Sequence, residues 1–597
     1  DMLKARMDDL AAGDYAVDLD VRGPIALAAN AARRAFRLTQ GGKTQFTIPV
    51  TGAGMGRAEI DLKLSGPNIS ASQTLAINVQ PGSTELYQRT VRPLPAGSSI
   101  TLSNDLLANF LPGTGAVSVA VTPYGGIDVG ALLQALDRYP YGCSEQIVSR
   151  AMPLLYVNRL ASSQMLALDT DAEKRVRDAI ERVLSRQASS GAFGLWSANN
   201  AGDDLWLDAF ITDFLTRARE AKYDVPQRSF DQALDRLRNQ VANAGDIKTS
   251  EAAGIAYAVY VLARNGRPVM GDLRYFADTK LSSFDTALSR AQIAAALAML
   301  GDRGRAQQAF ASAAQRLREQ QRNRYSRSDY GTRLRDSAGL LTLAAETDDS
   351  DRNLLALAGA AVQEERAATS YTSTQENTWM VLAAQALFKE AQTMQLSVAG
   401  VPQTGALYRT WRGTALERGD IAIGNTGQGA TQVVITTSGH PATPEPAASR
   451  GYQVERQYYK LDGKPADLAQ VKQNDRLVVV LKVTELEAAY ARLMLVDKLP
   501  AGLEIDNPRL FDGGSVSDLA FAKATVEPTH QEFRDDRFVA AFDRSGSDRA
   551  TFNIAYIVRA VTPGRYVLPP AIVEDMYRPE RFGRTGTGTF DIGEAQR

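Results

Sequence analysis

The stretch Tyr139–Gln146, which reads YPYGCSEQ, lies at the start of one helix in a long helical part of the chain. A proline and a glycine within it interrupt the preceding helix, and an amphipathic segment follows from Ile147 to about Leu160. Cys143 and Gln146 therefore fall near the first turn of the new helix, where residues three positions apart meet on one face. A cysteine sulfur and a glutamine carboxamide in this arrangement can condense, with loss of ammonia, to an internal β-cysteinyl-γ-glutamyl thioester.

The residues around Cys143 favour this reactive interpretation over simple burial. Cys143 is the only cysteine among 597 residues, and most lone cysteines are small buried hydrophobic residues. However, a Glu at +2 (Glu145) with a Gln at +3 (Gln146) arises by chance after only about one cysteine in several hundred at average residue usage. The preceding Tyr141 and Gly142 make the chance match rarer still. The motif therefore predicts a chemically reactive site.

The composition is that of a globular protein with several domains. Hydrophobic residues make up 44% and charged residues 23%, and 67 Lys and Arg side chains balance 68 Asp and Glu side chains. This balance argues against a nucleic-acid binder and against a disordered chain. With one cysteine and two histidines, His440 and His530, the chain cannot assemble a Cys/His zinc site or an intramolecular disulfide. We therefore expect neither a metal nor an organic cofactor, and about four domains at roughly 150 residues each.

The sequence carries no recognisable targeting segment. Residues 1–21 lack an apolar core like that of a signal peptide, and no stretch approaches about 20 uninterrupted apolar residues. The chain begins with Asp1 and enters strand-like alternation at Tyr15–Val21. We therefore expect it to be a fragment of a longer protein.

Hydrophobic periodicity divides the chain into a helical block and flanking β segments. From Ile127 to about Met394, apolar residues recur with helical spacing. Within this block, Gln187–Trp196 followed by Leu205–Leu215 has the turn-and-buried-helix pattern of toroids built from helical hairpins. The short β segments on either side of the block could pair with each other, which would make the block an insertion. Alternating apolar positions predict strands at Thr44–Val50, Ala58–Leu64, Thr74–Val79, Ser99–Leu102, Ala116–Val121, Gln395–Val401, Tyr408–Trp411, Asp420–Ile423, Ala430–Thr437, Arg476–Thr484, Ala491–Asp497, Arg537–Phe542, Ala550–Val558 and Gly564–Leu568.

The motif PYGC-x-EQ and this organisation resemble the α2-macroglobulin and complement family of thioester proteins. The resemblance is to the bacterial branch, and it covers essentially the whole chain. It also rests on four other stretches: Tyr371–Trp379 (YTSTQENTW), Glu532–Ala541 (EFRDDRFVAA), Arg559–Pro563 (RAVTP) and Glu574–Pro579 (EDMYRP).

This resemblance implies a multidomain α+β fold. An all-helical α/α-toroid thioester domain (126–394) would be inserted in a CUB-type β domain, whose two parts are residues 81–125 and 395–445. A macroglobulin-like β-sandwich, truncated at its N-terminus, would precede it (1–80). A receptor-binding-like macroglobulin β-sandwich would follow it (446–597).

The resemblance also implies a function, that of a broad-spectrum proteinase inhibitor and not an enzyme. In this family a proteinase cleaves a bait region, the molecule rearranges, and the exposed thioester acylates the proteinase. Because no histidine lies between Ile127 and Met394 to act as an intermediate acyl acceptor, we expect a lysine of the proteinase to attack directly and form an amide with Gln146. The bait region and a lipobox are expected upstream of this sequence. By resemblance, the protein is expected to be a monomer in the periplasm, anchored to the inner membrane by an N-terminal lipid.

A thioester must also be protected from water. In this family the C-terminal domain packs against the thioester region, and Met576 and Tyr577 are our candidates for the shielding contact. Tyr139 and Tyr141 are the aromatic residues nearest to the motif in sequence. For all four residues, ordinary packing is an equally good interpretation.

Three alternatives remain open at this point. The first is a glycan-processing enzyme of helical-toroid type that uses Asp203, Asp204 and Asp208 as catalytic acids, although acids at a helix start are common. The second is a cysteine hydrolase, which would need His440 or His530 as a base although both lie in other expected domains. The third is a non-covalent binding module with a silent thioester.

Overall fold

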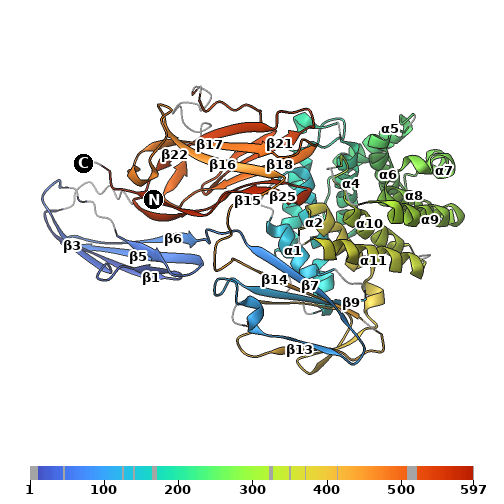
Figure 1. The fold of residues 1–597 in the computed structure, drawn as a ribbon, viewed down its shortest axis with the longest axis horizontal. Helices are drawn as coiled ribbons and strands as arrows, with labels where there is room; N and C mark the ends of the chain where they lie inside the picture. Colours follow the sequence, from blue (N-terminus) through green and yellow to red (C-terminus); the bar gives the residue numbers. More distant parts are fainter. Residues whose placement is uncertain are drawn as a thin grey trace.

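The computed structural model is a multidomain α+β fold that consists of a ring of helices and three groups of β sheets (Figure 1). The N-terminal sheet lies at one end of the molecule and the helical ring at the other (Figure 1). The structure describes residues 11–42, 44, 48–123, 127–138, 142–164, 171–202, 204–245, 247–321, 327–347, 351–369, 371–412, 415–429, 431–506, 519 and 521–595.

The N-terminal group is a four-stranded antiparallel sheet beside a two-stranded ribbon. The order in the sheet is β3-β1-β5-β6, and the expected strands Ala58–Leu64 and Thr74–Val79 lie within β5 and β6. For the expected strand Thr44–Val50, residues 45–47 lie outside the described residues, and β4 begins at Val50. The strands are β1 (Gly13–Arg22), β2 (Ile25–Leu27), β3 (Arg33–Leu38), β4 (Val50–Gly52), β5 (Gly56–Gly66) and β6 (Ile69–Val79).

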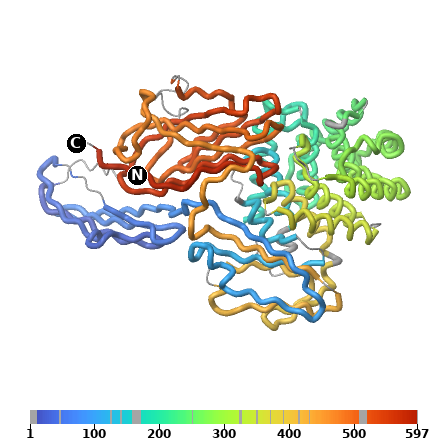
Figure 2. Tube along the Cα trace, viewed as in Figure 1, coloured from blue at the N-terminus to red at the C-terminus, as the bar shows by residue number. Residues whose placement is uncertain are grey.

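The second group consists of two four-stranded sheets, and each combines strands from before and after the helical ring. Their orders are β12-β9-β14-β7 and β11-β10-β13-β8. Val119 of β9, for example, pairs with Ile435 of β14, and the two parts of the chain run side by side in the trace (Figure 2). The helical block is therefore an insertion, as the sequence suggested. The strands are β7 (Leu86–Leu94), β8 (Ser99–Leu102), β9 (Ala116–Thr122), β10 (Gln395–Val398), β11 (Val401–Thr404), β12 (Leu407–Arg412), β13 (Ile421–Asn425) and β14 (Thr431–Gly439).

One predicted strand in this group is wrong. The stretch Gln395–Val401 is not a single strand, because β10 ends at Val398 and the chain returns as β11, with Val398 paired to Val401. The turn residues Ala399 and Gly400 have φ angles of 50° and 80°. Two consecutive residues with positive φ form the tight turn typical of a two-residue hairpin. The apolar character of the stretch concealed this turn.

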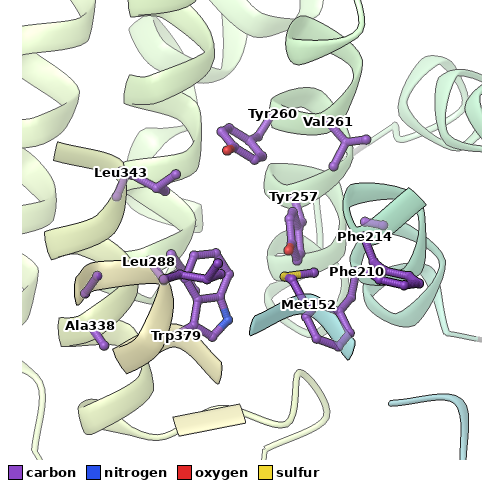
Figure 3. Close-up of a cluster of buried hydrophobic side chains, with 14 of the residues drawn as sticks. Met152, Phe210, Phe214, Tyr257, Tyr260, Val261, Leu288, Ala338, Leu343 and Trp379 are labelled. Carbon is purple, nitrogen blue, oxygen red and sulfur yellow. The ribbon is translucent and has the colours of Figure 1, made fainter. Parts of the chain in front are cut away.

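Six helices form a closed inner ring, in which each helix contacts the next in the order α2, α4, α6, α8, α10, α12 and back to α2. Inner helices are buried on nearly all sides, whereas outer helices such as α3 bury one face. The centre is filled by large side chains that include Met152, Phe210, Tyr257 and Trp379 (Figure 3). In the described part of the chain, each helix is too short or too polar to span a lipid bilayer. The helices are α1 (Val129–Arg138), α2 (Ser144–Gln164), α3 (Ala172–Leu184), α4 (Leu205–Glu220), α5 (Gln227–Ala242), α6 (Thr249–Arg264), α7 (Met270–Thr279), α8 (Ala287–Met299), α9 (Arg303–Glu319), α10 (Arg333–Glu346), α11 (Arg352–Ala368), α12 (Thr374–Ala386) and α13 (Phe388–Ala391).

The C-terminal group is a sandwich of a six-stranded and a four-stranded sheet, with orders β15-β25-β24-β18-β21-β20 and β16-β17-β22-β19, together with the ribbon β23-β26. In β18, Leu493 and Leu495 face the core of the sandwich, whereas Met494 and Val496 pack with the helical ring. The six-stranded sheet is thus covered on both faces, which explains the continuous apolar run in this strand. The strands are β15 (Ala448–Arg450), β16 (Tyr452–Lys460), β17 (Arg476–Glu485), β18 (Ala491–Lys498), β19 (Leu503–Ile505), β20 (His530–Phe533), β21 (Arg537–Arg544), β22 (Thr551–Ala560), β23 (Gly564–Leu568), β24 (Ala571–Asp575), β25 (Arg578–Arg584) and β26 (Gly588–Ile592).

Candidate functional site

The motif residues form the N-terminus of α2. The amide of Ile147 donates to the carbonyl oxygen of Cys143 at 2.9 Å, which is the first i to i+4 hydrogen bond of this helix. Cys143 is therefore the N-cap residue and Gln146 is the third residue of the helix, as the sequence predicted. Cys143, Glu145 and Gln146 are all 0% exposed. A thiol and a carboxamide thus lie one helical turn apart in a region closed to water.

A turn between α3 and α4 holds this helix start in place. Ser144 donates its backbone N–H to the carbonyl of Leu195 (2.8 Å) and its hydroxyl to the carbonyl of Gly194 (2.7 Å). Arg186 donates from Nη1 to the same Leu195 carbonyl (3.0 Å) and to Ser144 Oγ (3.2 Å). A Cβ at position 194 would lie 1.7 Å from the carbonyl oxygen of Ser197, so this close approach requires glycine.

Gln146 contacts a residue of the C-terminal sandwich. Its Nε2 lies 3.4 Å from the sulfur of Met576, whose backbone N–H donates to the carbonyl of Arg492 at 2.9 Å. Among the described residues, Gln146 Oε1 has no hydrogen-bond partner. A buried carboxamide with only a thioether as partner is unusual, because buried polar groups normally form hydrogen bonds.

Glu145 binds residues from three separate parts of the chain. Its carboxylate accepts hydrogen bonds from Tyr577 Oη of the sandwich (2.8 Å), from Gln375 Nε2 of α12 (2.7 Å) and from Ser149 Oγ of α2 (2.5 Å). The hydroxyl of Thr374 adds contacts at 3.0 and 3.1 Å to the two carboxylate oxygens. The stretch Tyr371–Trp379 thus reaches the motif, although the sequence gave no indication of these contacts.

A second contact between the sandwich and the ring surrounds Tyr330. The ring of Tyr577 meets the Tyr330 ring edge-on, with centroids 4.9 Å apart. The guanidinium of Arg492 lies 3.9 Å from the Tyr330 ring centroid and 3.7 Å from the carboxylate of Asp204, to which Tyr330 donates at 2.5 Å. Sequence reasoning missed Tyr330 and Arg492, because neither belongs to a motif.

The surroundings keep a thiol at this position protonated. Burial, and after it the negative charge of Glu145, raise the pKa of Cys143 to about 12, whereas Arg186 and Arg492 act in the opposite direction. Burial also raises the pKa of Tyr577 well above its usual value, so its hydroxyl is a neutral donor to Glu145. A free Cys143 thiol in this closed arrangement would therefore be a poor nucleophile.

The remaining sequence candidates have different positions. Gly142 lies against the guanidinium of Arg182, since a Cβ there would be 2.5 Å from Nη2. Tyr139 and Tyr141 lie outside the described residues. Met576 and Tyr577 are 2% and 4% exposed, and both touch the motif.

The acids of the glycan-enzyme alternative have structural partners. Asp204 caps α4, since its carboxylate accepts the Leu207 N–H at 3.0 Å, and it also binds Tyr330. Asp208 accepts the Phe193 N–H at 2.7 Å and pairs with Arg236 at 3.3 Å. Asp203 lies outside the described residues. These contacts favour a structural role for Asp204 and Asp208.

We predict that Asp208→Ala lowers the stability of the helical ring. The change removes the acceptor of the Phe193 N–H and the carboxylate paired with Arg236, which keeps only its hydrogen bond to the Gly202 carbonyl. Breaking a buried pair costs about 3–5 kcal/mol. Thermal unfolding should show a clearly lower midpoint for this variant than for the exposed-site control Asp178→Ala. An unchanged midpoint would make Asp208 a candidate catalytic acid again.

The two histidines differ in their relation to the site. His440 Nδ1 lies 3.0 Å from the carbonyl oxygen of Ser83, in the second β group. His530 belongs to the sandwich, yet its ring stacks on Trp196 of the helical block with centroids 4.2 Å apart. Its Nε2 lies 3.1 Å from the carboxylate of Glu532. His530 therefore contacts the helical block although it belongs to another domain. Its stacking on Trp196 and its contact with Glu532 indicate a packing role.

Comparisons with known proteins agree with this geometry. Residues 127–254 match a family model described as the A-macroglobulin TED domain, and residues 451–580 match the bacterial alpha-2-macroglobulin MG10 domain. The chain is 30% identical to alpha-2-macroglobulin of Escherichia coli over 92% of its length and 34% of that protein, and 28% identical to that of Xylella fastidiosa over 96% and 36%. It thus spans about a third of the length of these curated relatives.

Two solved structures are similar over nearly the whole chain. One is native Escherichia coli alpha-2-macroglobulin from domain MG7 to the C-terminus, with a TM-score of 0.86, 27% identity, and coverage of 98% of this chain and 94% of that one. The other is Salmonella alpha-2-macroglobulin reacted with methylamine, with a TM-score of 0.85, 29% identity, and coverage of 98% and 39%.

Proposed function

Because this chain belongs to the bacterial α2-macroglobulin family and corresponds to its C-terminal portion, we propose that it links proteinases covalently through a thioester between Cys143 and Gln146. The family is one of protease-trapping inhibitors, whose members are not named as enzymes. Tyr141, Gly142 and Glu145 complete the proposed thioester motif.

The observation that carries this proposal is the unsatisfied carboxamide of Gln146. It lies one helical turn from Cys143 and has no exposed surface, and among the described residues its Nε2 has the Met576 sulfur as a partner while its Oε1 has no hydrogen-bond partner. A buried acceptor without a hydrogen-bond partner, such as this Oε1, costs about 1–3 kcal/mol. Condensation with the thiol would remove the NH2 group and leave a thioester carbonyl, which is a weaker hydrogen-bond acceptor. The buried surroundings of Gln146 therefore suit the condensed form better than the separate side chains.

We further propose that Met576 and Tyr577 shield this bond. Met576 covers residue 146 and Tyr577 binds Glu145, so the sandwich contacts both ends of the motif. Withdrawal of the sandwich would expose the thioester to water and to amines at the same time. Tyr139 remains a further shielding candidate on the basis of the sequence alone.

The domain assignment belongs to the same proposal. It gives a macroglobulin-like domain at 1–80, a CUB-type domain at 81–125 and 395–445, the thioester domain at 126–394 and a receptor-binding-like macroglobulin domain at 446–597. We propose that a proteinase cleaves a bait region elsewhere in the full-length protein and that the sandwich then withdraws. A lysine of the proteinase attacks the carbonyl of residue 146, an amide forms, and Cys143 is released. The partners are then proteinases and the product is a covalent complex.

By its family, we place the full-length protein in the periplasm as a monomer with a lipid anchor. The non-covalent alternative, in which the thioester is silent, predicts the same fold without amine uptake. Incubation with amines therefore separates the two.

We predict that this chain takes up small amines but captures proteinases without regard to their activity, because we place the bait region in another part of the full-length protein. It should be incubated with an active proteinase and with the same enzyme blocked at its active site. Denaturing electrophoresis should then show equally weak adducts in both. Adducts formed only with the active enzyme would mean that the trigger lies within these residues. A complete lack of methylamine uptake by the native chain would contradict the proposed function.

A further inference from the structure

The charged and aromatic groups around Cys143 belong to two bodies that the proposed mechanism separates. Arg492, Met576 and Tyr577 are on the sandwich and would leave with it. Glu145 is on α2 and Arg186 is in the turn between α3 and α4, so both belong to the helical block and would stay. Of the two cations that lower the pKa of Cys143, only Arg186 therefore remains in the helical block when an amine arrives.

Arg186 is fixed directly against the residue that follows Cys143. Its Nη1 donates to Ser144 Oγ at 3.2 Å and to Leu195 O at 3.0 Å, and its own carbonyl accepts the Gly194 N–H at 3.1 Å. Side chain and backbone are thus both tied to the turn that holds the start of α2. These hydrogen bonds are all to residues of the helical block.

The hydrogen bonds of Arg186 do not by themselves require a positive charge at this position. Both oxygens that Nη1 binds are neutral, and a neutral amide could donate to them equally well. Partial burial lowers the pKa of Arg186, and so does the neighbouring Arg182, which means that the charge is costly there. The opposing influences are Cys143, when ionised, and Glu532, which lies on the sandwich. Once the sandwich leaves, Cys143 is the anion that Arg186 faces.

We infer that Arg186 is a positioning residue for acyl transfer, which holds the start of α2 and stabilises the Cys143 thiolate as it departs. This inference rests on the proposed function. In the step concerned, the amine nitrogen bonds to the carbonyl carbon of residue 146 and the carbon–sulfur bond breaks. The bonding electron pair goes to Sγ, and the proton of the amine passes to water. The products are an amide and a thiolate at a helix N-terminus beside an arginine, a setting that stabilises thiolates.

The test compares Arg186→Gln, Arg186→Lys and Ser144→Ala, each combined with Met576→Ala so that reagents reach the sulfur. After treatment with methylamine, the pKa of the Cys143 thiol is measured from the pH dependence of its alkylation by iodoacetamide. Arg186→Gln should raise this pKa by about one unit, at the low end of the roughly 1–3 units by which a nearby opposite charge lowers the pKa of an acidic group. Thiol release by methylamine should slow in parallel. Arg186→Lys keeps the positive charge, so its Cys143 thiol pKa and its rate of thiol release should stay close to those of the Met576→Ala parent.

Ser144→Ala separates electrostatics from structure, since it removes the hydrogen bond of Arg186 to Ser144 but keeps the charge. Its thiol pKa should equal that of the Met576→Ala parent. If Arg186→Gln leaves the pKa unchanged, or if Ser144→Ala shifts it equally, the inference is wrong. Should Arg186→Gln fail to form the thioester, its free Cys143 gives the same pKa directly. If the wild-type chain releases no thiol with methylamine, the proposed function itself fails, which is a different result.

Discussion

Replacing Cys143 with alanine is expected to abolish covalent uptake of amines completely. Without the sulfur no thioester forms, and the Gln146 carboxamide left behind does not acylate amines. The native chain should be incubated with a fluorescent primary amine and the bound label measured after denaturation. Gln146→Asn should have the same effect, because its shorter side chain cannot reach the sulfur.

The matched control is Lys174→Ala, which lies on α3 and pairs with Asp178 at the surface. Its amine uptake should equal that of the wild type. Label bound to Cys143→Ala at wild-type levels would mean that some other group carries the chemistry.

Removal of the proposed shield is expected to speed amine uptake strongly. Met576→Ala deletes the side chain that covers residue 146, and truncating a buried Met costs about 2–5 kcal/mol. If even part of this energy holds the sandwich closed, methylamine should react about ten- to a hundredfold faster, since 1.4 kcal/mol corresponds to a factor of ten. Tyr577→Phe removes one hydrogen bond to a carboxylate and should give a smaller increase. Stopped samples analysed by mass spectrometry give the rates.

The control for this prediction is Val539→Ala, because Val539 is buried in the same apolar cluster between sandwich and ring and its side chain cannot hydrogen-bond to the motif. If the substitutions only loosened the interface, methylamine uptake would be faster to the same extent in Met576→Ala, Tyr577→Phe and Val539→Ala. Direct shielding requires Met576→Ala to exceed Val539→Ala clearly. Equal rates for the three variants and the wild type would assign Met576 and Tyr577 to packing alone.

The sequence predicted the parts of the site that follow local rules. The helix start at Cys143 could be placed because proline and glycine precede it, and the ring could be recognised from its apolar spacing. The nearness of Met576 and Tyr577 to the motif was expected from family resemblance only. Tyr330, Arg492 and Arg186 were missed, because their roles arise where separate parts of the chain meet and no spacing records such a meeting.

Strand β16 and the β10–β11 hairpin were not predicted from the sequence, for two different reasons. Strand β16 was not predicted, since Arg456 interrupts its apolar alternation. The structure shows that this arginine is buried and paired with Asp497 at 2.5 Å. In the sequence, an arginine that forms a buried ion pair cannot be distinguished from an arginine exposed on the surface. The β10–β11 hairpin was missed because its turn contains Ala399, and alanine rarely adopts a positive φ.

The intact mass of the freshly purified native chain, combined with a thiol titration, shows whether Cys143 and Gln146 are joined. We expect a mass below that of the sequence by one ammonia and no titratable thiol until methylamine is added or the protein is denatured. Peptide mapping identifies a bond lost to hydrolysis, since position 146 would then carry Glu. A chain with the full sequence mass, Gln at position 146 and a freely titrating Cys143 would contradict the account.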